Sequence, residues 1–191
     1  MRRLSFSRPR RIAPDRMPGS VWSIYSMIRA SLSLTGCFRC EYPGQIDQMT
    51  RWFQQSLQVR TEGREIRDIT RLVAQVVAQS EVAVGLCHIF ITHTSASLTI
   101  TENADPKVHD DLQQFLLRLV PDGDPQFTHT SEGRDDMSAH IRSVLTAGSL
   151  TVPVTGARLI LGTWQGIYLW EHRTKPHERQ VVITISGAGD P

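Results

Sequence analysis

An apolar segment in the middle of the chain, residues 84–92, constrains the fold most strongly. Within it, residues 86–91 are hydrophobic on both sides of an extended chain, and His88 is the single exception. Such a run is typical of a strand that is covered on both faces of a sheet. We therefore predict a buried β-strand here, and the rest of the domain must supply the layers that cover it.

Segments with other periodicities lie on both sides of this strand. Residues 52–59 alternate between apolar and polar side chains, which predicts a second strand, and residues 62–65 have the composition of a turn. Apolar stripes at helical spacing predict helices at about 66–77, 106–120 and 136–146. Further strands are expected at residues 98–101, 150–154, 158–162, 166–171 and 180–186. Because helices and strands do not alternate strictly, the predicted fold class is α+β.

The first 48 residues differ in composition from the rest of the chain. They are rich in Arg, Ser and Pro, show no sustained periodicity, and carry eight Arg against three acidic residues. A targeting segment is disfavoured because Arg29 interrupts the apolar run. The other interpretations are a disordered arm and an over-long gene prediction with Met49 as the true start, and we favour the second. We therefore expect a disordered or wrongly included extension at residues 1–48 and one domain at residues 49–191.

Charge and cysteine content exclude several classes of protein. The net charge of the 191 residues is +2, but residues 1–48 alone contribute +5, so residues 49–191 carry −3. We therefore expect no nucleic-acid partner. No stretch approaches the roughly 20 apolar residues of a membrane helix, so we expect no membrane partner. Cys37 and Cys40 form a lone C-x-x-C motif and Cys87 lies in the apolar segment, so nothing requires an oxidising compartment, and the expected location is the cytoplasm.

Three histidines are candidates for a metal site. His93 ends the apolar strand, and His140 lies on the inner stripe of the third predicted helix, where a buried imidazole needs partners. His129 precedes this helix in a loop that is long enough to fold back toward it. Three neutral imidazoles are a common zinc shell, although His93 also fits as a satisfied histidine at a strand end. Asp135 and Asp136 are interpreted as carboxylates stabilised by the dipole of the helix that they begin.

Polar residues next to the first histidine are candidates for catalysis and binding. Thr94 and Ser95 follow it directly and supply hydroxyl groups. Glu102 and Asn103 could orient an imidazole through a hydrogen bond. Asp105 fits equally well as a base or metal ligand and as the N-cap of the following helix, in which proline is the first residue.

A glycine-flanked turn and two arginines form the last group of candidates. Glycines on both sides of Trp164 and Gln165 indicate a tight turn in which the backbone approaches a ligand closely. Glu171 follows on the next strand, and Arg173 and Arg179 could hold a phosphate or a carboxylate. The alternative interpretation is a solvated hairpin.

Four motifs, in one register, resemble the YjbQ family, also called UPF0047. They are the HTSASLT heptapeptide that begins at His93, the ENADP segment that begins at Glu102, residues 129–141, and the LGTWQGIY segment at 161–168. The resemblance extends from about residue 51 to residue 185. It implies a compact domain with extensive antiparallel β-sheet, assembled as a homotrimer. It also implies a site near the subunit boundaries at His93, His129 and His140, with a metal in some relatives, and a weak thiamine-phosphate synthase activity.

The implied synthase reaction sets chemical requirements on the site. It joins a thiazole phosphate to an aminopyrimidine pyrophosphate and releases pyrophosphate, so it needs phosphate binding, a cation and positioning of two rings. Histidines suit zinc or another transition metal, whereas magnesium prefers oxygen ligands. We therefore expect a divalent metal, zinc or magnesium, and a phosphorylated small-molecule substrate. Two alternatives stay open: a metal-dependent hydrolase or transferase with another primary substrate, and a non-catalytic trimer that binds a metabolite or a metal.

The candidate residues fall into three groups by predicted role. The predicted metal ligands are His93, His129 and His140. The predicted catalytic residues are His93, Glu102, Asn103, Asp105 and Glu171. The predicted substrate-binding residues are Thr94, Ser95, Trp164, Gln165, Arg173 and Arg179.

Overall fold

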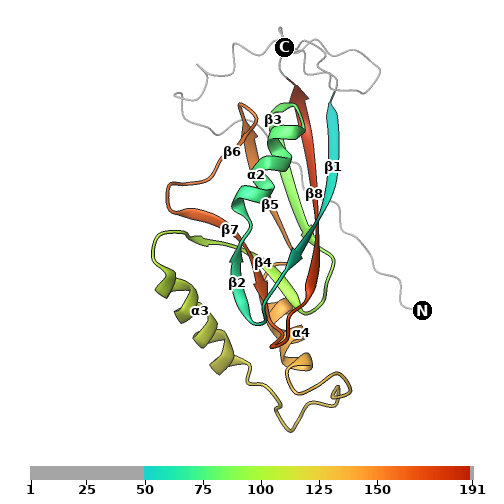
Figure 1. Cartoon of the computed structure of the whole chain (residues 1–191), viewed down its shortest axis with the longest axis vertical. Helices are drawn as coiled ribbons and strands as arrows, with labels where there is room; N and C mark the ends of the chain where they lie inside the picture. The colour runs from blue at the N-terminus through green and yellow to red at the C-terminus, as the bar shows by residue number, and fades with distance from the viewer. Residues whose placement is uncertain (1–49, 190–191) are drawn as a thin grey trace, which may run out of the picture. The chain divides into compact units, whose positions relative to one another are not determined.

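The computed structural model describes residues 50–189, which contain three helices and eight strands (Figure 1). The expectations for residues 1–48 lie outside the described residues. In chain order the elements are β1 (Arg51–Arg60), β2 (Glu65–Asp68), α2 (Thr70–Gln79), β3 (Val82–Ile91), β4 (Ala96–Glu102), α3 (Pro106–Leu119), α4 (Asp136–Leu145), β5 (Ser149–Thr155), β6 (Arg158–Leu159), β7 (Gln165–Glu171) and β8 (Glu178–Gly189).

The strands form two antiparallel sheets. The larger sheet has five strands in the order β1-β8-β3-β5-β6, and the smaller one has three in the order β2-β7-β4. Every pair of neighbouring strands is antiparallel. This arrangement confirms the predicted α+β class with extensive antiparallel sheet.

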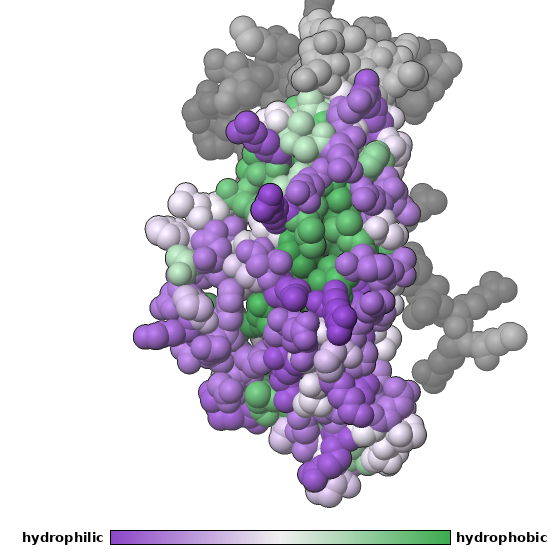
Figure 2. All heavy atoms as spheres, viewed as in Figure 1, coloured by the Kyte–Doolittle hydropathy of each residue, from purple (hydrophilic) through white to green (hydrophobic). Residues whose placement is uncertain are grey.

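The core lies where α2 and the smaller sheet meet the inner face of the larger sheet. Helix α2 crosses in front of the five-stranded sheet (Figure 1) and buries Val73, Val76 and Val77. Apolar residues of both sheets complete the cluster: Cys87, Ile89, Ile91, Val152, Val154, Val181, Ile183, Ile185, Leu98, Ile167 and Leu169. Figure 2 shows hydrophobic residues gathered beside α2 in the upper half of this face, and mostly polar residues in the lower half, which carries α3 and α4.

The predicted apolar strand is present as β3, but only one of its faces is covered within the chain. Cys87 and Ile89 are buried in the core. On the opposite face, Val84, Leu86 and Phe90 are 57%, 51% and 46% exposed, respectively. The expectation of two covered faces was therefore wrong for one chain, because no described element packs on the outer side of these three residues.

Two element boundaries also differ from prediction. The helix expected from about residue 66 begins at Thr70, because Ile66 pairs with Trp170 at the edge of the smaller sheet. The Asp68 carboxylate accepts a 2.7 Å hydrogen bond from the Thr70 amide, which directs the chain into the helix. The strand expected at 158–162 is limited to Arg158 and Leu159, and the residues after it form an irregular connection to β7.

Candidate functional site

The predicted site residues lie at the two ends of β4. His93, Thr94 and Ser95 precede the strand, next to α4 and the start of β8. Glu102 ends the strand and pairs with Gln165 on β7. Strands rise about 3.3 Å per residue, so these two ends are roughly 20 Å apart. The candidates therefore do not form one site within a single chain.

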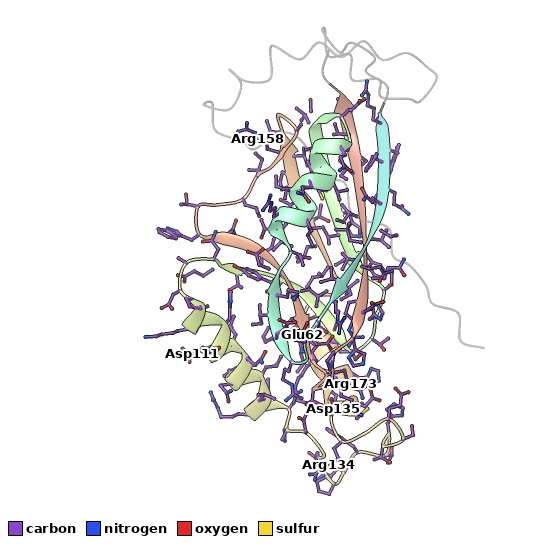
Figure 3. All side chains as sticks on the ribbon, viewed as in Figure 1. Glu62, Asp111, Arg134, Asp135, Arg158 and Arg173 are labelled. Atoms are coloured by element: carbon purple, nitrogen blue, oxygen red, sulfur yellow. The ribbon has the colours of Figure 1, made fainter. Side chains whose placement is uncertain are left out.

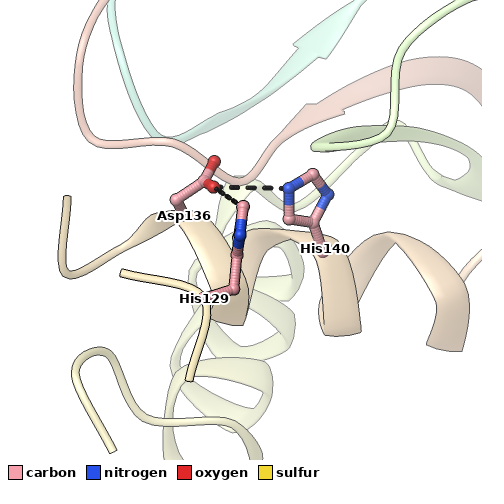
Figure 4. Close-up of side chains that lie close together, drawn as sticks. All are labelled: His129, Asp136 and His140. Atoms are coloured by element: carbon pink, nitrogen blue, oxygen red, sulfur yellow. Dashed lines mark ion pairs between the residues drawn. The ribbon is translucent and has the colours of Figure 1, made fainter. Parts of the chain in front are cut away.

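A cluster of three metal-ligating side chains occupies the α4 end. Asp136 and His140 are four residues apart on α4 and share one face of the helix. His129 reaches in from the loop before the helix (Figure 4). The ligand atoms of the three residues lie within 4.8 Å of one another. The Oδ2 atom of Asp136 is 2.8 Å from His129 Nε2 and 3.4 Å from His140 Nε2.

The hydrogen bonding of this cluster favours a cation at its centre. His140 Nδ1 lies 3.0 Å from the carbonyl oxygen of Thr94. A carbonyl only accepts, so Nδ1 carries the hydrogen, and the lone pair of the neutral ring is on Nε2, facing Asp136 Oδ2. That oxygen is buried and receives no well-aligned hydrogen bond from any described residue. Two acceptors that face each other need either a proton that charges the ring or a metal ion between them.

The donor set fits a transition metal better than magnesium. Two imidazoles and one carboxylate with further positions open are found in catalytic zinc sites and in non-haem iron sites. The bond from His140 to the Thr94 carbonyl is the kind of outer contact that orients a metal-binding histidine. The cluster thus has the composition and the support of a metal site.

Arg173 holds the other oxygen of the Asp136 carboxylate. Its Nη1 donates a short hydrogen bond to Asp136 Oδ1, and its Nη2 donates to the carbonyl oxygen of Glu132 at 2.8 Å. Its Nε donates to Asp135 at 3.2 Å, and Figure 3 shows these two side chains beside each other. The structure therefore places Arg173, a predicted phosphate ligand, in contacts with its own chain.

Asp135 is fixed by the same contacts. Burial by itself would raise the pKa of Asp135, but hydrogen bonds from the Thr174 amide and hydroxyl, together with the Arg173 guanidinium, lower it to about 2. The loop that carries His129 and the start of α4 are thus joined to the segment after β7. This junction orients the carboxylate of Asp136.

His93 is not part of the cluster. Its Nε2 accepts a 2.8 Å hydrogen bond from the Gln180 amide, and Thr92 also bonds to Gln180 through its amide and hydroxyl. Pairing with β8 therefore holds His93 on the sheet, and Asp136 stands where a third imidazole was expected. Burial and then the Arg179 charge lower the pKa of His93, with Glu171 acting in the opposite direction.

Glu171 and Arg179 form a buried ion pair beside His93. Two guanidinium nitrogens donate to the two carboxylate oxygens, each at 2.6 Å. Thr61 donates to Glu171 at 3.0 Å, and Arg179 donates to the Ser95 hydroxyl at 3.1 Å. Such a bidentate pair balances the two charges. Its members are placed to support the site and not to receive a substrate anion.

A second buried polar group lies near α4 and was not predicted. Ser97 and His172 are 2.9 Å apart through Oγ and Nε2. Arg142, only 1% exposed, donates to Asp122 at 2.8 Å and to the Val120 carbonyl at 2.6 Å. No local pattern identifies these partners. Asp136 was recognisable in principle, because its i, i+4 spacing from His140 places both on one helix face.

At the other end of β4, three of the predicted residues, Glu102, Trp164 and Gln165, line an open groove. The groove has a volume of about 600 Å³ and is lined by Ile100, Thr101, Glu102, Ala104, Trp164 and Gln165. Asp105 is outside this lining, and its carboxylate accepts a 2.9 Å hydrogen bond from the Lys107 amide at the start of α3. The structure thus shows Asp105 in the capping role.

None of the helices of residues 50–189 is both long enough and apolar enough to cross a bilayer.

Comparisons with known proteins give one consistent result. The model of the family described as "UPF0047 protein YjbQ-like" matches residues 55–188. A UPF0047 protein of Synechocystis is 48% identical over 72% of this chain and 93% of its own. YjbQ of Escherichia coli O157:H7 is 41% identical over 71% of this chain and 99% of its own. A crystal structure of an uncharacterized YjbQ/UPF0047 protein from Clostridium acetobutylicum, 36% identical, matches 70% of this chain and 98% of its own with a TM-score of 0.61.

Proposed function

Since the chain belongs to the YjbQ/UPF0047 family, we propose that it is a metal-dependent enzyme that acts on a phosphorylated small molecule. The observation that carries this proposal is the buried Asp136 Oδ2, which faces two histidine Nε2 atoms and has no well-aligned hydrogen bond from the described residues. Hydrolysis and group transfer are the reaction types that such a site supports.

The proposed division of roles follows from the contacts. His129, Asp136 and His140 would hold a zinc or similar ion. When bound, such an ion would stabilise negative charge on a phosphate oxygen. Arg173 holds the Asp136 carboxylate in place. His93 has a lowered pKa and accepts at Nε2, so its neutral ring carries the hydrogen on Nδ1 and can donate to a substrate oxygen.

Thiamine-phosphate synthesis is the specific reaction that we propose as one activity of this site. The family resemblance suggests it, and a cation beside the departing pyrophosphate is the requirement that the cluster meets. Arg173 and Arg179, the two arginines predicted to bind substrate, both pair with carboxylates of their own chain. We therefore propose it as a secondary activity, with the primary substrate another phosphorylated molecule.

Zinc binding tests the proposal directly. We expect one zinc per chain in the full-length protein, and at least a tenfold loss of zinc affinity in Asp136→Asn and in His140→Ala, because each removes a ligand. Asp111→Asn is the matched control, since Asp111 is an exposed carboxylate on α3, away from the cluster. His93→Ala separates the two ligand sets: it retains zinc if Asp136 is the third ligand and loses zinc if His93 is. Calorimetry and elemental analysis give both measurements.

An activity assay tests the enzymatic part. The zinc-loaded and magnesium-supplemented proteins are given the thiazole phosphate and the aminopyrimidine pyrophosphate, and pyrophosphate release is followed together with hydrolysis of a panel of phosphate esters. We expect turnover that is lost in His140→Ala and kept in Asp111→Asn. Equal zinc affinity in wild type and Asp136→Asn would overturn the metal site. Zinc binding without turnover of any compound would instead favour a metal-binding protein.

We also propose that the protein assembles as a homotrimer. The support is the family resemblance together with the uncovered apolar residues of β3, since exposed apolar patches in soluble proteins commonly mark interfaces. Assembly would also allow the metal cluster of one chain to meet the groove of another, although each chain keeps these two features roughly 20 Å apart.

A further inference from the structure

The groove between the end of β4 and the turn before β7 has the chemistry of a binding site of its own. We infer that it binds a planar organic cation, such as a positively charged nitrogen heterocycle. The inference concerns residues at the opposite end of β4 from the metal cluster and does not depend on the metal. The inference rests on the Trp164 indole and the Glu102 carboxylate, both of which line the groove.

The walls of the groove are held in place by hydrogen bonds. The Asn103 side chain donates to the carbonyl oxygens of Thr163 and Gln165, at 3.3 Å and 3.2 Å, and the Asn103 amide donates to the Trp164 carbonyl at 3.1 Å. The Gln165 side chain accepts from the Gly162 amide at 2.8 Å, which closes the turn. A ligand therefore meets a surface that is already ordered, and little conformational entropy is lost on binding.

Trp164 is an exposed aromatic residue on this fixed backbone. It is 66% exposed, although its main-chain oxygen is bonded to Asn103. A large exposed ring that contributes nothing to the core is available for stacking on a ligand. Tryptophan is also the aromatic side chain that attracts cations most strongly.

Glu102 supplies the negative charge. Its main-chain oxygen accepts from His109 Nε2 at 2.8 Å and from the Tyr168 hydroxyl at 3.2 Å, so its position is fixed. Within residues 50–189, its carboxylate forms no ion pair. The lining contains no lysine or arginine, which argues against a phosphate or another anion as the ligand.

The remaining lining defines the shape of the ligand. Ile100 and Ala104 are apolar, and Thr101 and Gln165 offer neutral polar groups. An apolar surface, an indole and one carboxylate together fit a flat ring with a delocalised positive charge. A compact, strongly hydrated ion such as ammonium would leave the apolar surface unused.

The test uses 1-methylquinolinium as the probe and quinoline, which is neutral at pH 7.5, as the uncharged ring. Binding to the full-length protein is measured by saturation-transfer NMR and calorimetry. We expect the cation to bind and the neutral ring to bind at least fivefold more weakly. Glu102→Gln should weaken cation binding by about fivefold and change binding of the neutral ring by less than twofold. Trp164→Leu should weaken cation binding by about fivefold, the scale of a cation–π contact.

Matched controls separate the groove from general surface effects. Phe115→Leu removes an aromatic residue that is 58% exposed on α3, and Glu62→Gln removes an exposed carboxylate elsewhere. Both should bind the cation as wild type does. The inference is overturned if the cation does not bind, if the neutral ring binds equally well, or if the control variants lose as much affinity as the groove variants. Circular dichroism checks that every variant is folded.

Discussion

Individual charged residues of this chain obtain their partners mainly from distant segments. Asp122, in the loop after α3, accepts from Arg64 and Arg142, each at 2.8 Å, and from Ser138 at 2.6 Å. Burial would raise the pKa of Asp122, but these three donors lower it. One contact of the candidate metal cluster is also distant, because the Thr94 carbonyl sets the tautomer of His140 across 46 positions in the sequence.

His172 gives a prediction of pH dependence at this scale. It is 1% exposed, and burial, followed by the charges of Arg142, Arg64 and Arg179, lowers its pKa from 6.5 to about 3. Between these two values the unfolded chain binds a proton that the folded chain does not. The free energy of unfolding therefore falls as the pH is lowered from about 6.5 toward 3, by about 1.4 kcal/mol per pH unit.

Urea unfolding between pH 4.5 and 7.5 measures this slope. The variant His172→Gln keeps a group that can bond to Ser97 but cannot take up a proton. The slope of its unfolding free energy against pH should therefore be smaller by about 1.4 kcal/mol per pH unit. An unchanged slope in His172→Gln would show that His172 does not titrate in this way.

At the scale of elements, helix ends determine what two of the aspartates do. Asp136 begins α4, and the helix presents it on the same face as His140, which places two candidate metal ligands on one element. Asp105 precedes α3, and its carboxylate bonds to the Lys107 amide, which creates a cap. In the sequence both are carboxylates at the start of a helix, and only their surroundings distinguish them.

The capping role of Asp105 can be measured. We expect Asp105→Ala to lower the free energy of unfolding by about 1 kcal/mol, because the Lys107 amide loses its hydrogen-bond acceptor. Asp105→Ser should retain most of the wild-type stability, because serine can also cap a helix. Asp111→Ala, in the second turn of the same helix, is the control and should be neutral within about 0.5 kcal/mol. Zinc affinity should be the same in all three variants. Loss of zinc binding in Asp105→Ala would instead identify Asp105 as a zinc ligand.

For the molecule as a whole, the outer face of the five-stranded sheet is the main unexplained surface. Strand register places Trp52 and Leu86 in one row across β1, β8 and β3, and Phe90 two rows further along. All three are exposed apolar residues. Burying each of them at a subunit interface would contribute roughly 1.5–3 kcal/mol.

The proposed homotrimer gives a prediction at this scale. We expect light scattering on the eluting protein to give three times the chain mass. Leu86→Asp and Phe90→Asp should dissociate it, because a charge would be buried in the interface. Phe115→Asp changes an equally exposed apolar residue on α3 and should leave the mass unchanged. A wild-type monomer would contradict the trimer, and a trimer that survives both β3 variants would place the interface on another face.

The sequence by itself determined the features that depend on local periodicity. The alternation in β1, the apolar run of β3 and the positions of α3 and α4 each follow from neighbouring residues, and so does the Asp-Pro start of α3. The predicted inner stripe of α4 was wrong, because the helix buries Asp136, Ala139 and Arg142 and leaves Val144 83% exposed. The tertiary structure decided which side chains meet. His93 bonds to β8 and therefore lies outside the cluster of His129, Asp136 and His140. The loop before α4 places His129 next to Asp136. Helix α2 covers only one face of β3, and the other face is exposed. These outcomes depend on loop paths and strand register, which bring distant residues together and leave no periodic signal in the chain.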